Sequence, residues 1–502
     1  MKPDSSLPLI QRAAAYDQRI AIIDAKGPHT YGALCRASQQ AASMLLGNRS
    51  DLNETRVAFM IPPGFDYAAV QWGIWRAGGI AVPLCVTYPP PELEYVITDA
   101  DADVIVTHPE FAAILEPLAD KHNRCFMRLP EIFNSTEAAL PTIDIDRRAM
   151  ILYTSGTTGK PKGVVTTHRN TIAQITSLVE AWQWRSDDHI LHVLPLHHVH
   201  GIINKLLCPL WSGAVCEMLP HFDAETVWQR FIHSGLTLFM AVPTIYVKLI
   251  AAWEKAAPEA RRQMSAACLK MRLMVSGSAA LPVSVFEKWQ EISGHTLLER
   301  YGMTEIGIGI SNPLHGERRP GHIGTPLPGV FSRLTDDTGK EVTTEGVSGE
   351  IHIKGKNVFL EYWRRPAETQ ASFQGDWFRT GDTAVIERGY YRILGRQSVD
   401  IIKTGGYKVS ALEIEEVLRT HAAIQECAVV GIEDPQWGER VCAAVVLKTG
   451  SRLNLADLRQ WAREKIAAYK IPGRLLVLEE FPRNAMGKVT KPALKKMFTN
   501  GT

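Results

Sequence analysis

The sequence predicts an α/β protein with layered, largely parallel sheets, followed by a small β-rich subdomain and a compact α+β unit. Three observations indicate this fold class. Short apolar, β-branched runs recur along the first part of the chain, and segments with helical spacing separate several of them. Strands punctuated by glycine and proline follow, and a mixture of strands and helices fills the C-terminal part.

The expected elements follow the chain in order. Apolar runs are expected as strands at residues 56–61, 103–108, 150–154, 189–196, 236–242 and 272–277. Helical spacing between them lies at Asn170–Trp182, Ala224–His233 and Val283–Ile292. From about Gly321, short strands alternate with glycine and proline, which is typical of a small antiparallel or barrel-like subdomain.

The pattern of the sequence changes again near residues 394–398, where glycine-punctuated strands give way to mixed strands and helices and the α+β unit is expected to begin. This unit is expected to contain a helix at Ala411–Arg419, strands near 426–432 and 440–447, and a helix near Leu455–Ala468. A chain of 502 residues is too long for one ordinary core. We therefore predict two domains, residues 1–395 and residues 396–502.

Composition excludes several classes of protein. Lys and Arg (55) nearly balance Asp and Glu (53), so no nucleic-acid partner is expected. The eight cysteines form no CxxC pair, and reduced core residues are expected rather than disulfides or zinc ligands. No apolar run is long enough to span a membrane. The N-terminus shows neither a signal peptide nor a clear transit peptide, so a cytoplasmic location is expected.

The strongest motif is YTSGTTGKPKG, residues 153–163, which follows directly on an apolar run. Glycines let backbone N–H groups approach phosphate oxygens, while hydroxyls add donors and lysines add positive charge. The spacing is not that of a Walker loop. This density of donors predicts a triphosphate-binding loop rather than a flexible turn, with the binding residues Thr154, Ser155, Gly156, Thr157, Thr158, Gly159 and Lys160.

The loop resembles the signature of the adenylate-forming superfamily, which contains acyl-CoA synthetases, adenylation domains and luciferase. Further segments resemble the motifs of this family in the family's order: PLHHVHG (195–201), VPTIY (242–246), SGSAAL (276–281), ERYGMTE (299–305), RTGD (379–382), GRQSVDIIKTGGYKV (395–409) and PRNAMGK (482–488). Together the motifs span residues 150–490. The resemblance implies a large ATP- and acid-binding domain followed by a small mobile lid domain.

The resemblance assigns roles in the attack of a carboxylate on the α-phosphorus of ATP. Thr304 would donate to the α-phosphate, Glu305 would hold Mg²⁺, and Lys488 would bridge the attacking carboxylate and the phosphate. The implied nucleotide-binding residues are Gly277, Ser278, Ala279, Ala280, Tyr301 (on adenine), Asp382 (on the ribose) and Arg396. Lys488 could also be a site of regulatory acetylation.

A second step, attack by the thiol of coenzyme A, is implied as well. In the family the C-terminal domain rotates and brings a glycine-rich strand to the site. The matching residues are Gly405, Gly406 and Lys408, with Lys408 near the phosphates of the coenzyme. The family's hinge position falls at Ser398, but this segment is one residue longer than usual, so the hinge could be Ser398 or Asp400. The oligomeric state stays open.

The acid is indicated by Arg300, which precedes the family's Tyr, where most relatives have a small or neutral residue. A buried guanidinium is costly unless an anion meets it, and a dicarboxylate keeps one carboxylate free after activation. This arginine resembles the malonyl-CoA synthetase branch, which implies malonate as the acid, with methylmalonate possible. His198, His200, Val242 and Met303 are expected to line the pocket with Arg300.

Several alternatives stay open from the sequence. Arg300 could instead form a structural salt bridge with Glu299 or Glu305. The chain could ligate another short- or medium-chain acid to coenzyme A, or load a carrier protein. It could also be a non-catalytic nucleotide-binding member of the same fold, although Glu305 and Lys488 are both present.

Overall fold

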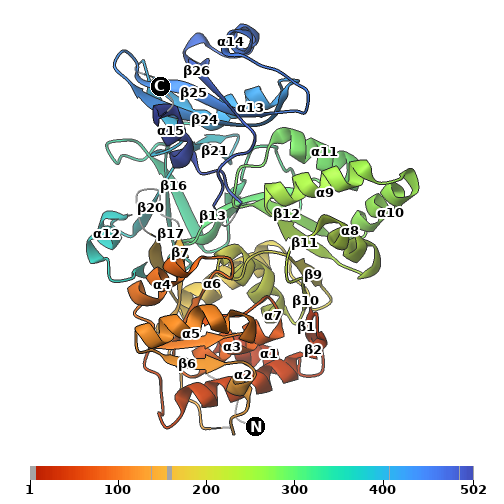
Figure 1. Ribbon diagram of the computed structural model, residues 1–502, viewed down its shortest axis with the longest axis vertical. Coiled ribbons are helices and arrows are strands. Elements are labelled where there is room, and N and C mark those ends of the chain that lie inside the picture. The colour runs from red at the N-terminus through yellow and green to blue at the C-terminus, as the bar shows by residue number, and fades with distance from the viewer. Residues whose placement is uncertain (1–6, 137, 155–160, 406, 485–486, 501–502) are drawn as a thin grey trace. The chain divides into compact units, whose positions relative to one another are not determined.

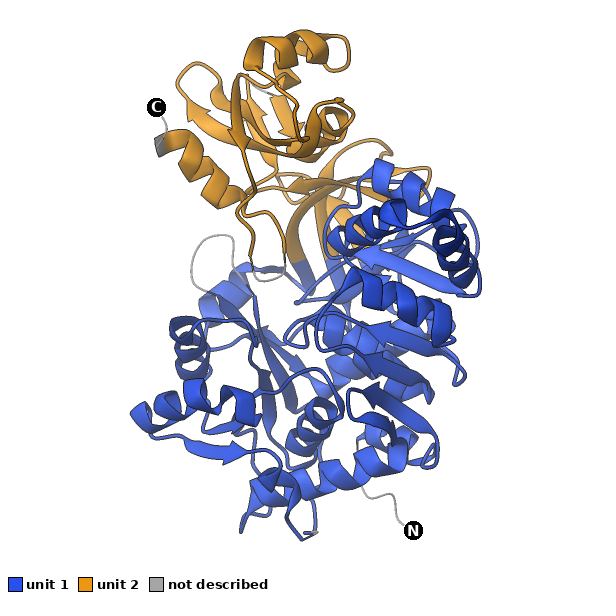
Figure 2. Cartoon of the chain, turned by 45° about the vertical axis from the view of Figure 1, so that its right-hand side comes forward, with its two compact units in different colours: residues 1–320, 324–331, 353–378 blue, residues 321–323, 332–352, 379–502 orange. Residues whose placement is uncertain are grey.

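The computed structural model describes residues 7–136, 138–154, 161–405, 407–484 and 487–500. The chain divides into two compact units, which Figure 2 shows in blue and orange. Unit 1 comprises Met1–Pro320, Gly324–Phe331 and Ile353–Phe378. Unit 2 comprises Gly321–Ile323, Ser332–His352 and Arg379–Thr502. The domains 1–395 and 396–502 stay a prediction.

A nine-stranded sheet in unit 1 has the order β15-β14-β13-β12-β11-β9-β10-β1-β2. Its strands are β1 (Ile20–Asp24), β2 (Gly27–Thr30), β9 (His189–His192), β10 (Val215–Met218), β11 (Leu238–Ala241), β12 (Leu273–Gly277), β13 (Leu298–Met303), β14 (Gly307–Ser311) and β15 (Thr325–Pro326). The strands from β13 to β1 run parallel, and β2, β14 and β15 join antiparallel at the two edges. Parallel strands bring their carboxyl ends to one edge of the sheet, where binding residues commonly gather.

A seven-stranded sheet in the same unit has the order β18-β8-β7-β4-β3-β5-β6. Its strands are β3 (Arg56–Met60), β4 (Ile80–Pro83), β5 (Val104–Thr107), β6 (Cys125–Arg128), β7 (Arg148–Thr154), β8 (Lys162–Thr167) and β18 (Glu361–Tyr362). Strand β7 pairs antiparallel with β8, so Thr154 lies opposite Lys162. The phosphate-loop motif therefore connects two neighbouring strands of this sheet.

Helices cover these two sheets (Figure 1). The helices of unit 1 are α1 (Pro8–Ala14), α2 (Tyr31–Leu46), α3 (Phe65–Arg76), α4 (Pro90–Asp99), η1 (Pro109–Phe111), α5 (Ala112–Lys121), η2 (Glu131–Phe133), α6 (His168–Ala181), η3 (His200–Leu207), α7 (Cys208–Ser212), α8 (Ala224–His233), α9 (Pro243–Lys255), α10 (Pro258–Cys268), α11 (Val283–Ser293) and α12 (Pro366–Ala371). Aromatic side chains from α8, α9 and α11 form a core with β11 around Trp228, Tyr246, Trp289 and Phe239. No described helix is both long and apolar enough to cross a membrane.

The remaining strands form two five-stranded sheets. One contains β16 (Val330–Thr335), β17 (Gly349–Gly355), β19 (Phe373–Gln374), β20 (Trp377–Glu387) and β21 (Tyr390–Arg396). The other, in unit 2, contains β22 (Ile401–Thr404), β23 (Tyr407–Ser410), β24 (Ile424–Asp434), β25 (Gly438–Leu447) and β26 (Arg474–Leu478). Its helices are α13 (Ala411–Arg419), α14 (Leu455–Arg463), η4 (Ala468–Lys470) and α15 (Lys491–Asn500).

The elements expected from the apolar and helical patterns are present. Helices α8 and α13 have the bounds that the spacing predicts, because a polar side chain caps each of them. Asp223 accepts a hydrogen bond from Thr226 N, and Ser410 accepts one from Glu413 N. Helix α14 ends at Arg463, earlier than the predicted Ala468, and a short 3₁₀ turn at Ala468–Lys470 follows.

Candidate active site

Arg300 lies inside unit 1 on β13, with 4% of its surface exposed. Strands β12 and β13 run parallel with Gly277 opposite Arg300. A Cβ added to Gly277 would lie 2.6 Å from Arg300 Nε and 2.7 Å from Cζ. The guanidinium therefore lies directly on the backbone of Gly277, and glycine at this position leaves the space that the arginine occupies.

Ser278 links Arg300 to a histidine. The Ser278 hydroxyl accepts a hydrogen bond from Arg300 Nη2 at 3.2 Å and lies 3.2 Å from His200 Nδ1. Ser278 has a φ of +70°, a left-handed conformation that non-glycine residues rarely adopt and that often occurs at functional sites. Because the hydroxyl accepts from Arg300, its own proton is available to Nδ1, which leaves the proton of the ring on Nε2.

Arg300, Ser278 and His200 form a cluster, here called the Arg300 cluster, whose electrostatics favour a bound anion. Burial, with the charge of Arg300 next, lowers the pKa of His200 well below its usual value, so the ring is neutral at pH 7. Burial also lowers the pKa of Arg300, to about 9, and the group stays charged at neutral pH. Neither Arg300 Nε nor His200 Nε2 has a hydrogen-bond partner among the described residues. The buried positive charge of Arg300 therefore lies beside two N–H donors, Arg300 Nε and His200 Nε2, that are available to an anionic ligand.

Arg300 forms no salt bridge with a described carboxylate, Glu299 and Glu305 included: burial alone shifts its pKa, and its Nη2 donates to the Ser278 hydroxyl. Glu305 is buried in the turn between β13 and β14, where its Oε1 accepts a hydrogen bond of 2.8 Å from the Tyr362 hydroxyl. Its carbonyl accepts from Phe359 N at 2.7 Å. The glutamate is thus held by the segment that contains β18 and not by the arginine.

Two of the predicted nucleotide residues come together in unit 2. Asp382 on β20 and Arg396 on β21 lie opposite each other, and Arg396 Nε donates to Asp382 Oδ1 at 2.9 Å. Lys488 is exposed, and its backbone N donates to Asn484 Oδ1 at 3.0 Å. This hydrogen bond holds the backbone of Lys488 against the side chain of Asn484.

The residues predicted to contact coenzyme A are also in unit 2. Gly405 has a φ of +55°, and a Cβ there would lie 3.1 Å from the ring of Trp437. Lys408 is exposed and forms an ion pair with Asp337. Gly406 lies outside the described residues, as do the phosphate-loop residues Ser155, Gly156, Thr157, Thr158, Gly159 and Lys160.

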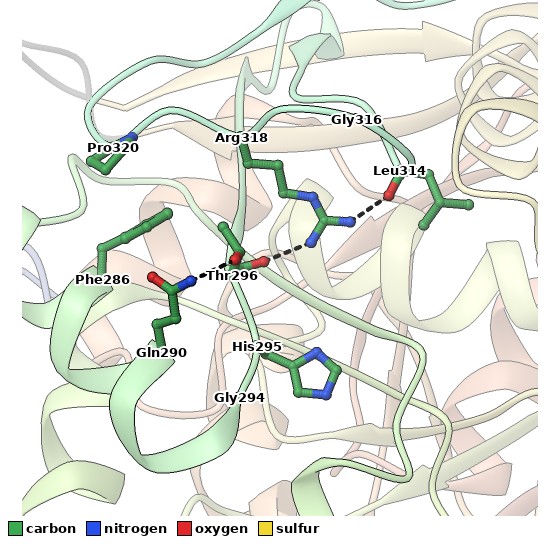
Figure 3. Close-up of a pocket in the computed structure, with 9 residues that line it drawn as sticks. All are labelled: Phe286, Gln290, Gly294, His295, Thr296, Leu314, Gly316, Arg318 and Pro320. Carbon is green, nitrogen blue, oxygen red and sulfur yellow. Dashed lines mark hydrogen bonds between the residues drawn. The ribbon is translucent and has the colours of Figure 1, made fainter.

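Unit 1 also contains a hollow of about 440 Å³, whose lining residues Figure 3 shows. Arg318 lines it, but its guanidinium donates to the backbone carbonyls of Pro313, Thr296 and Leu314. His295, which also lines it, has a ring nitrogen 2.7 Å from the carbonyl of Cys268. These side chains hold loops in place, and none of the predicted site residues lines this hollow.

Comparison with known families decides the class of protein. A family model described as AMP-binding enzyme matches residues 9–363, and one described as AMP-binding enzyme C-terminal domain matches residues 413–488. The chain belongs to the AMP-binding enzyme family. These matches, together with the relatives described in the next paragraph, confirm the resemblance to the adenylate-forming superfamily and to its malonyl-CoA synthetase branch.

Relatives in this family match nearly the whole chain. The mitochondrial malonate–CoA ligase ACSF3 of Xenopus laevis is 47% identical, over 98% of this chain and 92% of its own. A malonate–CoA ligase of Arabidopsis thaliana is 42% identical, over 89% of this chain and 79% of its own. The crystal structure of ATP-bound MatB from Rhodopseudomonas palustris has a TM-score of 0.91 and 33% identity, covering 99% of both chains. The predicted fold class is confirmed by this match.

The other predicted residues of unit 1 lie on or directly beside η3, α9, β12 and β13. His198 Nδ1 accepts a hydrogen bond from His200 N at 3.4 Å, and Val242 precedes α9. Met303 ends β13 and Thr304 is buried directly after it. Tyr301 on β13 is buried, whereas Ala279 and Ala280 after β12 are exposed.

Two contacts of the candidate site could not be predicted from the sequence. Tyr362, which holds Glu305, stands in none of the motifs quoted above, and its neighbours in the sequence do not signal a contact with a residue so distant along the chain. The packing of Gly277 against Arg300 was also missed, because the SGSAAL motif was assigned wholly to the nucleotide. Only the parallel register of β12 and β13 reveals that contact.

Proposed function

We propose that this protein ligates malonate to coenzyme A at the expense of ATP. Malonate is first activated as malonyl-adenylate with release of pyrophosphate, and the thiol of coenzyme A then displaces AMP. Relatives whose names are malonate–CoA ligase support the proposal, because they match the chain at 42–47% identity. Methylmalonate, which carries one extra methyl group, is proposed as a poorer substrate, since a single methyl is worth about 1–3 kcal/mol in a pocket.

The observation that carries the proposal is the buried guanidinium of Arg300. It has no carboxylate partner among the described residues, and its Nε donor is unused. A monocarboxylate would present an apolar tail to this charge, whereas malonate presents its second carboxylate. An arginine paired with a carboxylate forms charge-assisted hydrogen bonds that offset the cost of burial.

The first step joins two anions, so it depends on charge neutralisation and positioning. In the proposed mechanism Lys488 supplies a positive charge to the attacking carboxylate and the α-phosphate, while Thr304 donates to the same phosphate. Asp382 accepts from the ribose hydroxyls, and Arg396 orients Asp382. Arg300 and His200 hold the free end of malonate so that its other carboxylate is presented to the nucleotide.

Mg²⁺ is part of the proposal, and Glu305 fits the requirements of this ion. Magnesium prefers oxygen ligands and is commonly held by one or two carboxylates together with phosphate oxygens of the substrate. Glu305 is a buried carboxylate with one oxygen oriented by Tyr362. When bound, the ion neutralises charge on the phosphates.

The proposal is tested by offering the purified protein malonate, methylmalonate, acetate and butyrate together with ATP and coenzyme A. Pyrophosphate release gives the rate of adenylation for each acid, and mass spectrometry identifies the thioester. We expect malonyl-CoA as the main product when the acids compete. A preference for acetate or butyrate would assign the chain to another acyl-CoA ligase, and ATP binding without any adenylate would indicate a non-catalytic member of the family.

Replacing Lys408 with glutamate is expected to weaken the use of coenzyme A. The substitution turns an exposed positive charge into a negative one near the proposed position of the coenzyme's phosphates. We expect the KM for coenzyme A to rise about tenfold or more, and malonate-dependent pyrophosphate release to stay nearly unchanged.

The matched control for Lys408→Glu is Asp337→Asn, which removes the ion pair of Lys408 but keeps its charge. Such exposed pairs contribute little to stability, about 0–1 kcal/mol. The KM for coenzyme A in this control should match that of the wild-type protein. An equal rise in both variants would show that Lys408 acts only through its ion pair.

A further inference from the structure

Helix η3, His200–Leu207, is a π-helix whose eight residues are all buried. In a π-helix each backbone N–H bonds five residues back, so residues four and five positions apart lie on the same side. Asn204 and Lys205 therefore flank His200 on one side of η3. That side contacts the Arg300 cluster, because His200 Nδ1 lies 3.2 Å from Ser278 Oγ. Single π-helical turns are frequent at functional sites.

Asn204 is fully buried, and neither its Oδ1 nor its Nδ2 has a hydrogen-bond partner among the described residues. Other buried asparagines of unit 1 do form hydrogen bonds: Asn357 Nδ2 donates to the Ile306 carbonyl at 2.7 Å, and Asn312 Nδ2 donates to the Glu299 carbonyl at 3.0 Å. A buried amide without any partner is costly, because it has lost its hydrogen bonds to water and gained none. Asn204 thus has both a donor and an acceptor ready for a ligand.

Lys205, the next residue, is a second buried basic group on the same side of η3, and burial lowers its pKa to about 7, so that about half of it is protonated at neutral pH. It is fully buried, and its Nζ donates to the Met240 carbonyl on β11 at 2.6 Å and lies 5.1 Å from the centre of the Phe239 ring. No described carboxylate pairs with it. Residue 242, which is predicted to line the acid pocket, follows β11 directly. The charge of Arg300 and the protonated fraction of Lys205 together favour an anion over a neutral group beside η3.

We propose that Asn204 is a further substrate-binding residue, whose side-chain N–H donates to the free carboxylate of malonate beside Arg300 and His200. Three unpartnered donors, Arg300 Nε, His200 Nε2 and Asn204 Nδ2, come from elements that meet at Ser278. A carboxylate has two oxygens and accepts several hydrogen bonds, so it can satisfy all three. The amide adds a donor without adding a charge, which makes the pocket select a carboxylate over an alkyl group at that position. This inference rests on the proposed function.

The test compares Asn204→Leu, which has a similar shape and no polar atoms, with Asn204→Asp, which places a negative charge at the same position. Steady-state pyrophosphate release is measured for malonate and for butyrate, together with the melting temperature of each variant. We expect Asn204→Leu to lower kcat/KM for malonate about tenfold or more, mainly through KM, and to leave kcat/KM for butyrate within about threefold. Asn204→Asp should lower the malonate value further, since like charges repel. The melting temperature of Asn204→Leu should not fall, because an unpartnered amide has been removed.

The experiment distinguishes a failure of the proposed function from a failure of the role assigned to Asn204. If the wild-type protein prefers butyrate to malonate, the proposed function fails before any variant is examined. If the wild-type protein uses malonate but Asn204→Leu loses malonate and butyrate activity equally, or loses neither, Asn204 does not bind the acid. A buried water on the amide would give that second result, since it does not distinguish the two acids. Restoration of malonate activity in Asn204→Gln, which keeps the amide, would support the assignment.

Discussion

Replacing Lys488 with alanine is expected to abolish adenylation while sparing formation of the thioester from supplied malonyl-adenylate. The first step brings a carboxylate against a phosphate, and loss of one positioned positive charge commonly costs about 100- to 1000-fold in rate. The second step has no such meeting of anions at the reacting carbonyl. Pyrophosphate release measures the first step, and AMP release from synthetic malonyl-adenylate with coenzyme A measures the second.

A matched control for this variant is Lys496→Ala, which removes an exposed lysine from α15 in the same unit. Both half-reactions should be unaffected there. Lys488→Arg keeps the charge but changes its shape, and partial recovery of adenylation is expected. If Lys488→Ala slowed both steps equally, the lysine would have to act on the fold of the C-terminal segment rather than on the first reaction.

Replacing Arg300 with alanine is expected to remove the preference for malonate. Loss of one partner from a buried, hydrogen-bonded charge pair commonly costs about 2–5 kcal/mol, so kcat/KM for malonate should fall by about 30-fold or more. Most of the change should appear in KM, because the free carboxylate takes no part in the chemistry. For butyrate, which has no second carboxylate, the loss should stay within about tenfold. The same acid panel in a pyrophosphate-release assay measures both.

Two companion variants separate the charge of Arg300 from its position. Arg300→Met keeps much of the volume without the charge, and the ligand-free protein should not lose thermal stability, because a buried charge without a carboxylate partner has been removed. Gly277→Ala keeps the charge but places a methyl group where the guanidinium lies. Its malonate KM should rise while its butyrate KM changes little. Parallel losses for both acids in all of these variants would argue against an anchoring role.

The sequence predicted the fold well, because its strands and helices carry strong apolar periodicity and clear caps. The α/β layers, the bounds of α8 and α13 and the membership of the superfamily all followed from contiguous motifs. Arg300 was identified because a single unusual residue stood inside one of these motifs. Local sequence is sufficient for such features, since the information lies within a few neighbouring residues.

Contacts between distant segments could not be predicted in the same way. The hydroxyl of Ser278 joins Arg300 to His200 only because β12 and β13 lie side by side and η3 approaches the end of β12. Asn204 stands beyond the last residue of the PLHHVHG motif, and nothing in its neighbours reveals that its amide lacks a partner. The roles of these side chains depend on the register of strands and on the winding of one helix.

Because the guanidinium rests against the backbone of Gly277, its place is set before any acid arrives. Under the proposed function it binds the free carboxylate equally in the acid, the adenylate and the thioester product. Binding of this kind lowers the KM for the acid but does not accelerate either bond-forming step. The contact between Arg300 and the carboxylate must also break each time malonyl-CoA dissociates. The arginine that selects the acid therefore slows product release, and a higher affinity for the carboxylate would lower the turnover rate.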